Sequence, residues 1–205
     1  VRRAVTYLFD EQEHDGSWFG RWGVNHIYGT GAVLPAMAML GYDAANDERI
    51  AAAARWIASH QNDDGGWGES PASYMDDAWR GCGPSTASQT AWAMMALIAA
   101  GSNKYASAVR QGADYLMRTQ LPDGTWDEPQ YTGTGFPGYG VGKRRQRKGL
   151  TSPVSSDQQS DSKDHVALDQ GVELRRGFMI NYNLYRHYFP LMALGRARRF
   201  LRGKD

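Results

Sequence analysis

Apolar residues recur at helical spacing in several stretches of the chain. Ile50, Ala53, Ala54 and Ile57 follow the i, i+3, i+4, i+7 pattern of an amphipathic helix, and a similar spacing begins at Ala4. Both patterns run into a glutamine and then into Asp and Gly, which favour a turn. The sequence therefore predicts helices with one polar face, each followed by a polar turn.

More continuously apolar stretches lie between these amphipathic ones. We expect helices over 30–41, 85–100 and 178–201. Ser85 has the residue type of an N-cap for the second of them. Pro35 is expected in the first turns of the first, where a missing N–H costs little. The alternation of polar-faced and apolar helices predicts an all-α protein, an α-α barrel whose apolar helices form the inner ring.

The turns after the polar-faced helices share a repeated motif. Each copy has an aromatic-aliphatic pair, then a glutamine, and then Gly-x-Trp. Copies that recur at about fifty to sixty residues indicate stacked, related supersecondary units. The glutamine and tryptophan of the three copies are Gln12 and Trp18, Gln61 and Trp67, and Gln120 and Trp126.

This motif resembles the QW motif of triterpene cyclases. Three longer strings sharpen the resemblance to the C-terminal part of a squalene-hopene cyclase: GSWFGRWGVNHIYGTG at 16–31, DEPQYTGTGFPG at 127–138 and YNLYRHYFPLMALGR at 182–196. The resemblance covers nearly the whole chain except about 139–177. It implies a toroid of six helical hairpins, of which this chain would supply about half and upstream sequence the rest.

The chain divides into three predicted parts. Residues 1–138 form the QW-repeat part of the barrel, residues 139–177 a polar and charged insertion, and residues 178–205 the final inner helix. The insertion contains KRRQRK at 143–148, followed by SPVSSDQQSDSKD. Such a composition buries too little apolar surface to offset the entropy of ordering. We therefore expect a disordered surface insertion.

Composition and charge argue against several other classes of protein. A net charge of +1 with intermixed signs does not fit a nucleic-acid-binding surface. The longest apolar run, Ala91 to Ala100, is shorter than the roughly 18 to 20 residues that cross a bilayer. No signal peptide is visible, and because the chain opens at Val1 inside a repeat, we expect further residues upstream. The single cysteine, Cys82, excludes an internal disulfide, and a reducing, cytoplasmic side is expected.

The resemblance implies cyclisation of squalene to hopene or hopanol through carbocations. This chemistry needs a strong acid and an aromatic cavity, because a cation over a ring face gains roughly 0.5 to 2 kcal/mol. In this chain Trp22, Phe136 and Phe178 would line that cavity. Tyr28 would belong to the hydrogen-bond network near the proton donor, and Ile180, Tyr182 and Tyr185 would shape the cavity. The QW glutamines and tryptophans are instead predicted to link the outer helices and stabilise them.

The acid itself is not found in this chain. The family's proton donor lies in an Asp-x-Asp-Asp string, and none occurs here. Asp63-Asp64 and Asp76-Asp77 lie in polar turns, where solvated carboxylates are the better interpretation. We therefore assign no catalytic residue and expect the acid upstream. The histidines show no i, i+4 pairing, so we expect neither a metal nor another cofactor.

The resemblance also implies partners, and it leaves alternatives open. The expected partners are squalene, the upstream part of the same cyclase, a second copy in a homodimer, and the cytoplasmic side of a membrane as a peripheral, monotopic surface. An oxidosqualene-type cyclase is the first alternative, although GTGFPG favours the bacterial squalene type. A zinc prenyltransferase β-subunit is another, with Cys82 as its lone candidate ligand. The third is a helical scaffold without turnover, which we favour for the isolated 205 residues.

Overall fold

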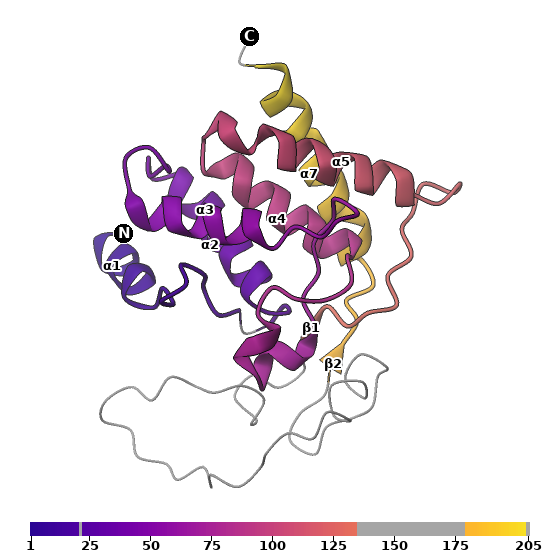
Figure 1. Cartoon of the computed structure of the whole chain (residues 1–205), viewed down its shortest axis with the longest axis horizontal. Coiled ribbons are helices and arrows are strands. Elements are labelled where there is room, and N and C mark those ends of the chain that lie inside the picture. Colours follow the sequence, from indigo (N-terminus) through magenta and orange to yellow (C-terminus); the bar gives the residue numbers. More distant parts are fainter. Residues whose placement is uncertain (21, 135–178, 204–205) are drawn as a thin grey trace, which may run out of the picture.

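Three helical hairpins make up most of the chain that the computed structural model describes, residues 1–20, 22–134 and 179–203 (Figure 1). The outer helices are α1 (Arg2–Asp10), α3 (Glu48–Ser59) and α5 (Ala106–Thr119). The inner helices are α2 (His26–Ala38), α4 (Ala87–Ala99) and α7 (Tyr185–Arg202). Shorter elements are the 3-10 helices η1 (Pro71–Tyr74), η2 (Asp77–Trp79) and η3 (Asn103–Tyr105), and the strands β1 (Gly133–Thr134) and β2 (Met179–Ile180).

The inner helices lie side by side, with α4 between α2 and α7 (Figure 1). Helix α3 packs against α2 and α4, and α5 packs against α4 and α7. This position explains the composition of α4, in which every residue from Ala87 to Leu97 is buried. In α3 the predicted stripe, from Ile50 to Ile57, faces the core. The all-α fold of stacked helical hairpins is confirmed.

Two details at the starts of the inner helices differ from expectation. Helix α2 begins at His26 rather than at residue 30, so Pro35 lies in the helix interior and not in its first turns. Helix α4 is capped by Thr86 rather than Ser85, and the Thr86 hydroxyl accepts the Gln89 N–H at 3.2 Å. The cap moves by one residue because Thr86 N–H donates to the Trp67 carbonyl, which holds Thr86 extended.

The last predicted helix also starts later than residue 178. Residues Met179 and Ile180 instead form β2, which pairs antiparallel with β1, and α7 begins at Tyr185. The partner strand explains the difference, because it offers backbone hydrogen bonds that periodicity along one segment cannot reveal. The proposed insertion at 139–177 lies outside the described residues.

The turns of the three QW copies have the same geometry. Gly16, Gly65 and Gly124 have φ of 96°, 87° and 85°, a left-handed conformation that favours glycine. The aspartate before each glycine accepts the backbone N–H two residues farther on, at 2.9 Å in all three copies. Each turn thus closes on itself, and this closure brings the following tryptophan back over the preceding outer helix.

Each QW tryptophan bonds to the end of its own outer helix. The indole N–H groups of Trp18, Trp67 and Trp126 donate to carbonyls ten residues upstream, those of Leu8, Ile57 and Leu116, at 2.6, 2.8 and 2.8 Å. These carbonyls lie in the last turn of a helix, where the usual i+4 N–H partner is lost, although the Ile57 carbonyl also accepts the N–H of the C-cap His60 at 3.2 Å. The glutamine of each QW copy makes a different set of hydrogen bonds.

The QW glutamines join a turn to the next outer helix. Gln12 Nε2 donates to the Gly16 carbonyl and to the Arg49 carbonyl of α3, at 2.8 and 2.9 Å. Gln61 Nε2 does the same with Gly65 and with Ala108 of α5, at 2.8 and 3.0 Å. We call this pair of bonds the QW link.

Candidate functional site

Three segments that lie far apart in the sequence meet in a small backbone ladder. Gly23 bridges to Gly133, and Gly133 pairs with Ile180 across β1 and β2. Val24 N–H donates to the Thr132 carbonyl, and Thr132 N–H donates to the Ile180 carbonyl, both at 3.1 Å. The ladder joins the segment of Trp22 to the two later segments that carry the family resemblance.

Gly133 is held between two of the predicted site residues. A Cβ at this position would lie 2.5 Å from the Trp22 carbonyl oxygen and 2.5 Å from Cε2 of the Tyr182 ring. Tyr182 N–H donates to the Thr132 hydroxyl at 3.0 Å, which fixes that ring beside the ladder. Only glycine leaves room for both neighbours at this point.

Behind the ladder, aromatic side chains form one cluster around Trp92. The Tyr28 ring lies edge-on to Trp92, with centroids 5.0 Å apart, and Tyr185 does so at 5.8 Å. Tyr182 stacks on Tyr185 at 4.5 Å. The structure therefore unites three of the predicted residues, although Tyr28 and Tyr185 come from different hairpins.

Trp92 was not among the predicted site residues. It is 2% exposed and lies in the middle of α4, and its sequence context AWAMM is that of an ordinary buried helix. Its indole N–H is buried without a hydrogen-bond partner among the described residues. Trp92 contacts Tyr28 and Tyr185, which belong to two segments that resemble the family. These contacts arise only when the helices pack together, so the sequence around Trp92 does not reveal them.

The phenols of Tyr28 and Tyr185 stay neutral around neutral pH. Burial, together with the neighbouring phenols Tyr188, Tyr28 and Tyr182, raises the pKa of Tyr185 to about 12. Burial and the nearby Tyr182 raise the pKa of Tyr28 as well. A neutral phenol offers a π face and a hydrogen bond without a negative oxygen that could combine with a cation.

The remaining predicted residues are placed as follows. Ile180 is partly buried in β2. Trp22 is 51% exposed and is tied to the site through its carbonyl beside Gly133. Phe136 and Phe178 lie outside the described residues. The described part of the candidate site therefore consists of the backbone ladder and the aromatic rings behind it, and we call these rings the aromatic wall.

Two buried glutamates near the site were missed by the sequence analysis. Glu69 accepts the Ile27 N–H at the start of α2, and Glu128 accepts the Ser88 N–H at the start of α4, both at 2.8 Å. Each glutamate comes two residues after a QW tryptophan, so the repeat contains a signal for them. A carboxylate at a helix N-terminus satisfies free N–H groups and favours the helix dipole.

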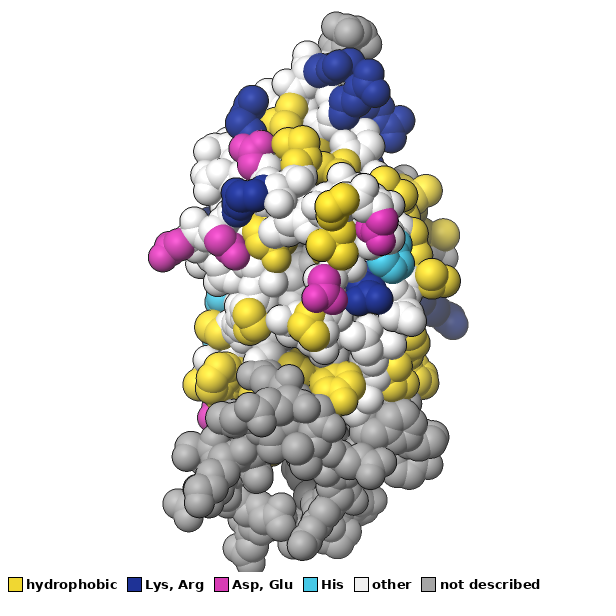
Figure 2. Space-filling model, turned by 90° about the vertical axis from the view of Figure 1, so that its right-hand side faces the viewer, with side chains coloured by type: hydrophobic (Ala, Val, Ile, Leu, Met, Phe, Trp, Pro, Cys, Tyr) yellow, Lys and Arg dark blue, Asp and Glu magenta, His cyan; other side chains and the backbone are white. Residues whose placement is uncertain are grey.

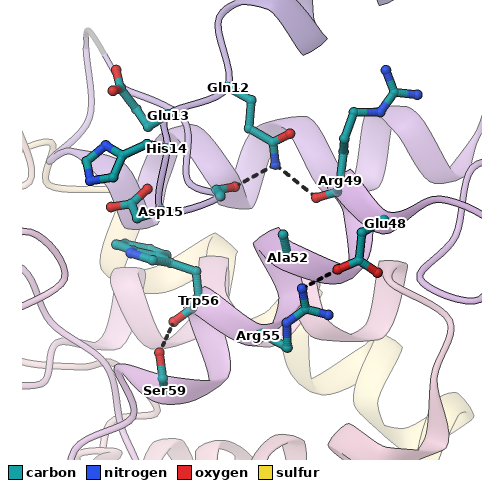
Figure 3. A pocket seen from close by; sticks show the side chains of 11 residues that line it. Gln12, Glu13, His14, Asp15, Glu48, Arg49, Ala52, Arg55, Trp56 and Ser59 are labelled. Atoms are coloured by element: carbon teal, nitrogen blue, oxygen red, sulfur yellow. Dashed lines mark hydrogen bonds and ion pairs between the residues drawn. The ribbon is translucent and has the colours of Figure 1, made fainter.

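A separate groove of about 550 Å³ lies between the first QW turn and α3 (Figure 3). Polar and charged side chains dominate its lining, among them Gln12, Asp15 and Arg55. None of the aromatic residues predicted for the site lines it. Because none of those aromatic residues reaches this groove, we do not place the site there.

Other observations bear on the alternatives. No group of three or more His, Cys, Asp or Glu suited to a metal ion occurs among residues 1–20, 22–134 and 179–203. Burial and the nearby Glu69 raise the pKa of the Cys82 thiol, which leaves it protonated at neutral pH. Within the same ranges, no helix has the length and apolar character needed to cross a membrane.

Comparison with known proteins decides the family. The profile described as squalene-hopene cyclase C-terminal domain matches residues 1–141. The chain belongs to the squalene-hopene cyclase family. Its segment of that fold contains the QW turns, the Trp22 segment and β1.

Relatives agree along most of the chain. The squalene–hopene cyclase of Alicyclobacillus acidocaldarius is 47% identical over 97% of this chain, and that of Bradyrhizobium diazoefficiens is 42% identical over 97%. Dammaradiene synthase from Dryopteris crassirhizoma is 47% identical over 67% of the chain. The chain covers 25%, 24% and 22% of these proteins, so it spans about a quarter of their length.

A solved structure supports the fold alone. A crystal structure of a protein from Actinoplanes superposes with a TM-score of 0.59, covers 96% of this chain and 50% of that protein, and is 18% identical. At this identity the likeness carries no functional argument.

Proposed function

We propose that the natural protein containing this chain is a triterpene cyclase that converts squalene to hopene and hopanol. The observation that carries the proposal is the aromatic wall, in which Tyr28, Tyr182 and Tyr185 meet around Trp92 beside the Trp22 ladder. The names of the relatives give the substrate class. This segment would supply part of the cavity wall and the QW links, but not the acid.

The chemistry assigns a task to each part. An acid outside this chain donates a proton to a terminal alkene of squalene, and successive ring closures carry the positive charge along the chain. The last cation either loses a proton, which gives hopene, or takes up water and then releases a proton from the bound water, which gives hopanol. Neutral tyrosines and indoles stabilise the passing cations by their ring faces. Their arrangement on helices and a ladder keeps them in place before the charge arrives.

The acid and the rest of the barrel are expected in the upstream part of the same protein. The exposed apolar side chains along α7 support this, since Leu184, Tyr188, Leu191 and Met192 recur at helical spacing on one face. Figure 2 shows hydrophobic side chains exposed on the side of the molecule that contains α5 and α7. We infer that a preceding hairpin of the cyclase covers this stripe.

A peripheral, monotopic position on the cytoplasmic side of a membrane is part of the proposal. Arg198, Arg199 and Arg202 are exposed at the end of α7, where Lys and Arg side chains gather (Figure 2). Positive side chains near a surface are attracted to anionic lipids. The homodimer rests on the family resemblance alone.

The competing functions are an oxidosqualene-type cyclase and a helical scaffold without turnover. Supplying squalene and oxidosqualene separately to the full-length protein and to this 205-residue chain alone, with products separated by gas chromatography, distinguishes all three. We expect conversion of squalene. Preference for oxidosqualene would favour the first alternative, and no conversion of either substrate would favour the second.

The decisive variant is Phe136→Ala in the full-length protein. Because the family resemblance places this ring beside late cations, its removal should release incompletely cyclised products and slow turnover. Unchanged product ratios in a folded variant would remove Phe136 from the cavity.

A further inference from the structure

We propose that Glu69 is a positioning residue, whose buried carboxylate fixes the Trp22 segment, residues 22–28, against the rest of the candidate site. The segment needs such a partner, because residues 22–25 lie outside the helices and strands and yet include Trp22. The proposal deepens the cyclase function proposed above and rests on it for its catalytic consequence.

The carboxylate bonds to successive groups where the Trp22 segment enters α2. Glu69 Oε2 accepts the N–H groups of Asn25 and Ile27 at 3.3 and 2.8 Å, and Oε1 lies 3.1 Å from Nδ1 of His26. One side chain, forty residues away in sequence, thus contacts three consecutive residues. Tyr28 follows directly after them in the first turn of α2.

The residues that follow Glu69 continue the contact. The Tyr74 hydroxyl lies 3.0 Å from the Gly20 carbonyl oxygen and 2.5 Å from the Gly23 carbonyl oxygen, and these two acceptors, one on each side of Trp22, share its single proton. Ser73 accepts the Asn25 side-chain amide at 3.2 Å. Residues 69–74 therefore form one hydrogen-bonded unit with Gly20 and the Trp22 segment.

This unit also sets the position of the Tyr28 ring. A Cβ on Gly23 would lie 2.4 Å from Tyr28 Cγ, and one on Gly20 would lie 2.7 Å from Cδ1 of the same ring. The backbone on both sides of Trp22 therefore packs directly on the ring. A displacement of the segment would move Trp22 and Tyr28 together.

Burial makes these bonds specific. The Glu69 side chain is 0% exposed, and Ser73 and Tyr74 are also buried. Burial alone would raise the pKa of Glu69, but its hydrogen bonds to His26 and to the Ile27 N–H outweigh this and lower the pKa below the ordinary value. A charged, buried carboxylate tolerates few arrangements of its donors, so it favours a single position of the segment.

Glu128 offers a matched control within the same chain. It occupies the equivalent place after Trp126 and binds the start of α4 through Ser88 N–H and the Ser88 hydroxyl, at 2.8 and 2.6 Å. Within the part of the chain that the structure describes, the Glu128 side chain makes no hydrogen bond to the Trp22 segment. Replacing either glutamate by glutamine changes a buried helix cap, but only Glu69→Gln affects the Trp22 segment.

The test uses the full-length protein labelled with 5-fluorotryptophan, in which Trp22→Phe identifies the ¹⁹F resonance of Trp22. We expect Glu69→Gln and Tyr74→Phe to shift or broaden this resonance, while Glu128→Gln leaves it unchanged. In squalene turnover, kcat should fall on the order of ten- to a hundredfold with KM nearly unchanged. Incompletely cyclised products should increase at the same time.

The outcomes separate the inference from the proposed function. A Trp22 resonance that stays as in the wild type in both folded variants would overturn the positioning role, even if both variants melt earlier. If Glu69→Gln does not fold, Tyr74→Phe decides alone. If the resonance moves but the wild-type protein does not convert squalene, the cyclase function fails and the positioning role stands.

Discussion

At the scale of single residues, Trp67 shows how one side chain fulfils two structural tasks. Its ring is completely buried in the core, and its indole N–H binds the Ile57 carbonyl at the end of α3. Its backbone N–H donates to the Thr90 hydroxyl of α4 at 2.9 Å. The residue therefore connects an outer helix, a turn and an inner helix.

We predict that Trp67→Ala lowers the free energy of unfolding by roughly 3 to 5 kcal/mol, since it leaves a large cavity. Trp67→Phe keeps much of the ring but loses the N–H donor, and should cost less. Thermal and urea denaturation measure both effects. The product pattern of the full-length enzyme should remain that of the wild type, and altered products from a folded Trp67→Ala variant would contradict a purely stabilising role.

The two buried glutamates should respond to pH with opposite signs. Burial raises the pKa of Glu128 above 4.5, although the bonds from Ser88 oppose the shift. Its stabilising contribution is therefore present below its unfolded pKa and lost as pH rises through the folded value. The pKa of Glu69 is lowered instead, so its contribution is present above the unfolded pKa and lost as pH falls through the folded one.

From these signs, Glu69→Gln should destabilise the protein more at about pH 7 than at about pH 3, because the ionised carboxylate contributes only at the higher pH. Glu128→Gln should become more favourable, relative to the wild type, as pH rises through the folded pKa of Glu128, because ionisation of the buried carboxyl destabilises the wild type. Urea denaturation at a series of pH values tests both. Parallel pH curves for the two variants would show that the assigned directions are wrong.

At the scale of elements, the QW link explains how the outer helices are kept in order. The Gln61 amide bonds both to its own turn and to the Ala108 carbonyl of α5, and the Gln12 amide repeats this with α3. Gln120 donates to the Gly124 carbonyl, its one recorded bond within the described residues. All three glutamines thus bond to a glycine carbonyl of their own turn, whereas Gln12 and Gln61 also bond to the next outer helix.

This difference leads to a prediction. Gln61→Ala should cost about 1 to 3 kcal/mol, because two hydrogen bonds of roughly 0.5 to 1.5 kcal/mol each are lost. Gln120→Ala serves as the control and should cost about 0.5 to 1.5 kcal/mol for its single bond. Chemical denaturation of the same protein preparation compares them. Equal losses would mean that the bond to α5 contributes nothing measurable.

At the scale of the whole molecule, the segment 139–177 separates two parts that meet in one ladder. We predict that a short Gly-Ser joint can replace it in the full-length enzyme, because each doubling of loop length costs only about 0.6 kcal/mol. Activity in detergent should persist. Binding to anionic liposomes should fall if the basic run 143–148 contacts lipid, at about 1 kcal/mol per charge. Loss of detergent activity would instead make the segment part of the active structure.

Much of the architecture could be predicted from the sequence, because it depends on neighbours along the chain. The apolar spacing from Ile50 to Ile57 predicted the buried face of α3, and the three Gly-x-Trp copies predicted stacked units. The resemblance of the strings around Trp22 and Tyr182 indicated the family, and the comparison confirms it. Such signals are local, since helical periodicity and turn residues act within a few positions.

What only the tertiary structure decided depends on contacts between distant segments. Thr86 caps α4 because Trp67 holds it extended, and α7 starts late because β1 pairs with β2. Trp92 and Glu69 join the candidate site because packing brings α4 against Tyr28 and residues 69–74 against the Trp22 segment. The role of a buried carboxylate or ring depends on the groups that surround it, and those groups are not neighbours in sequence.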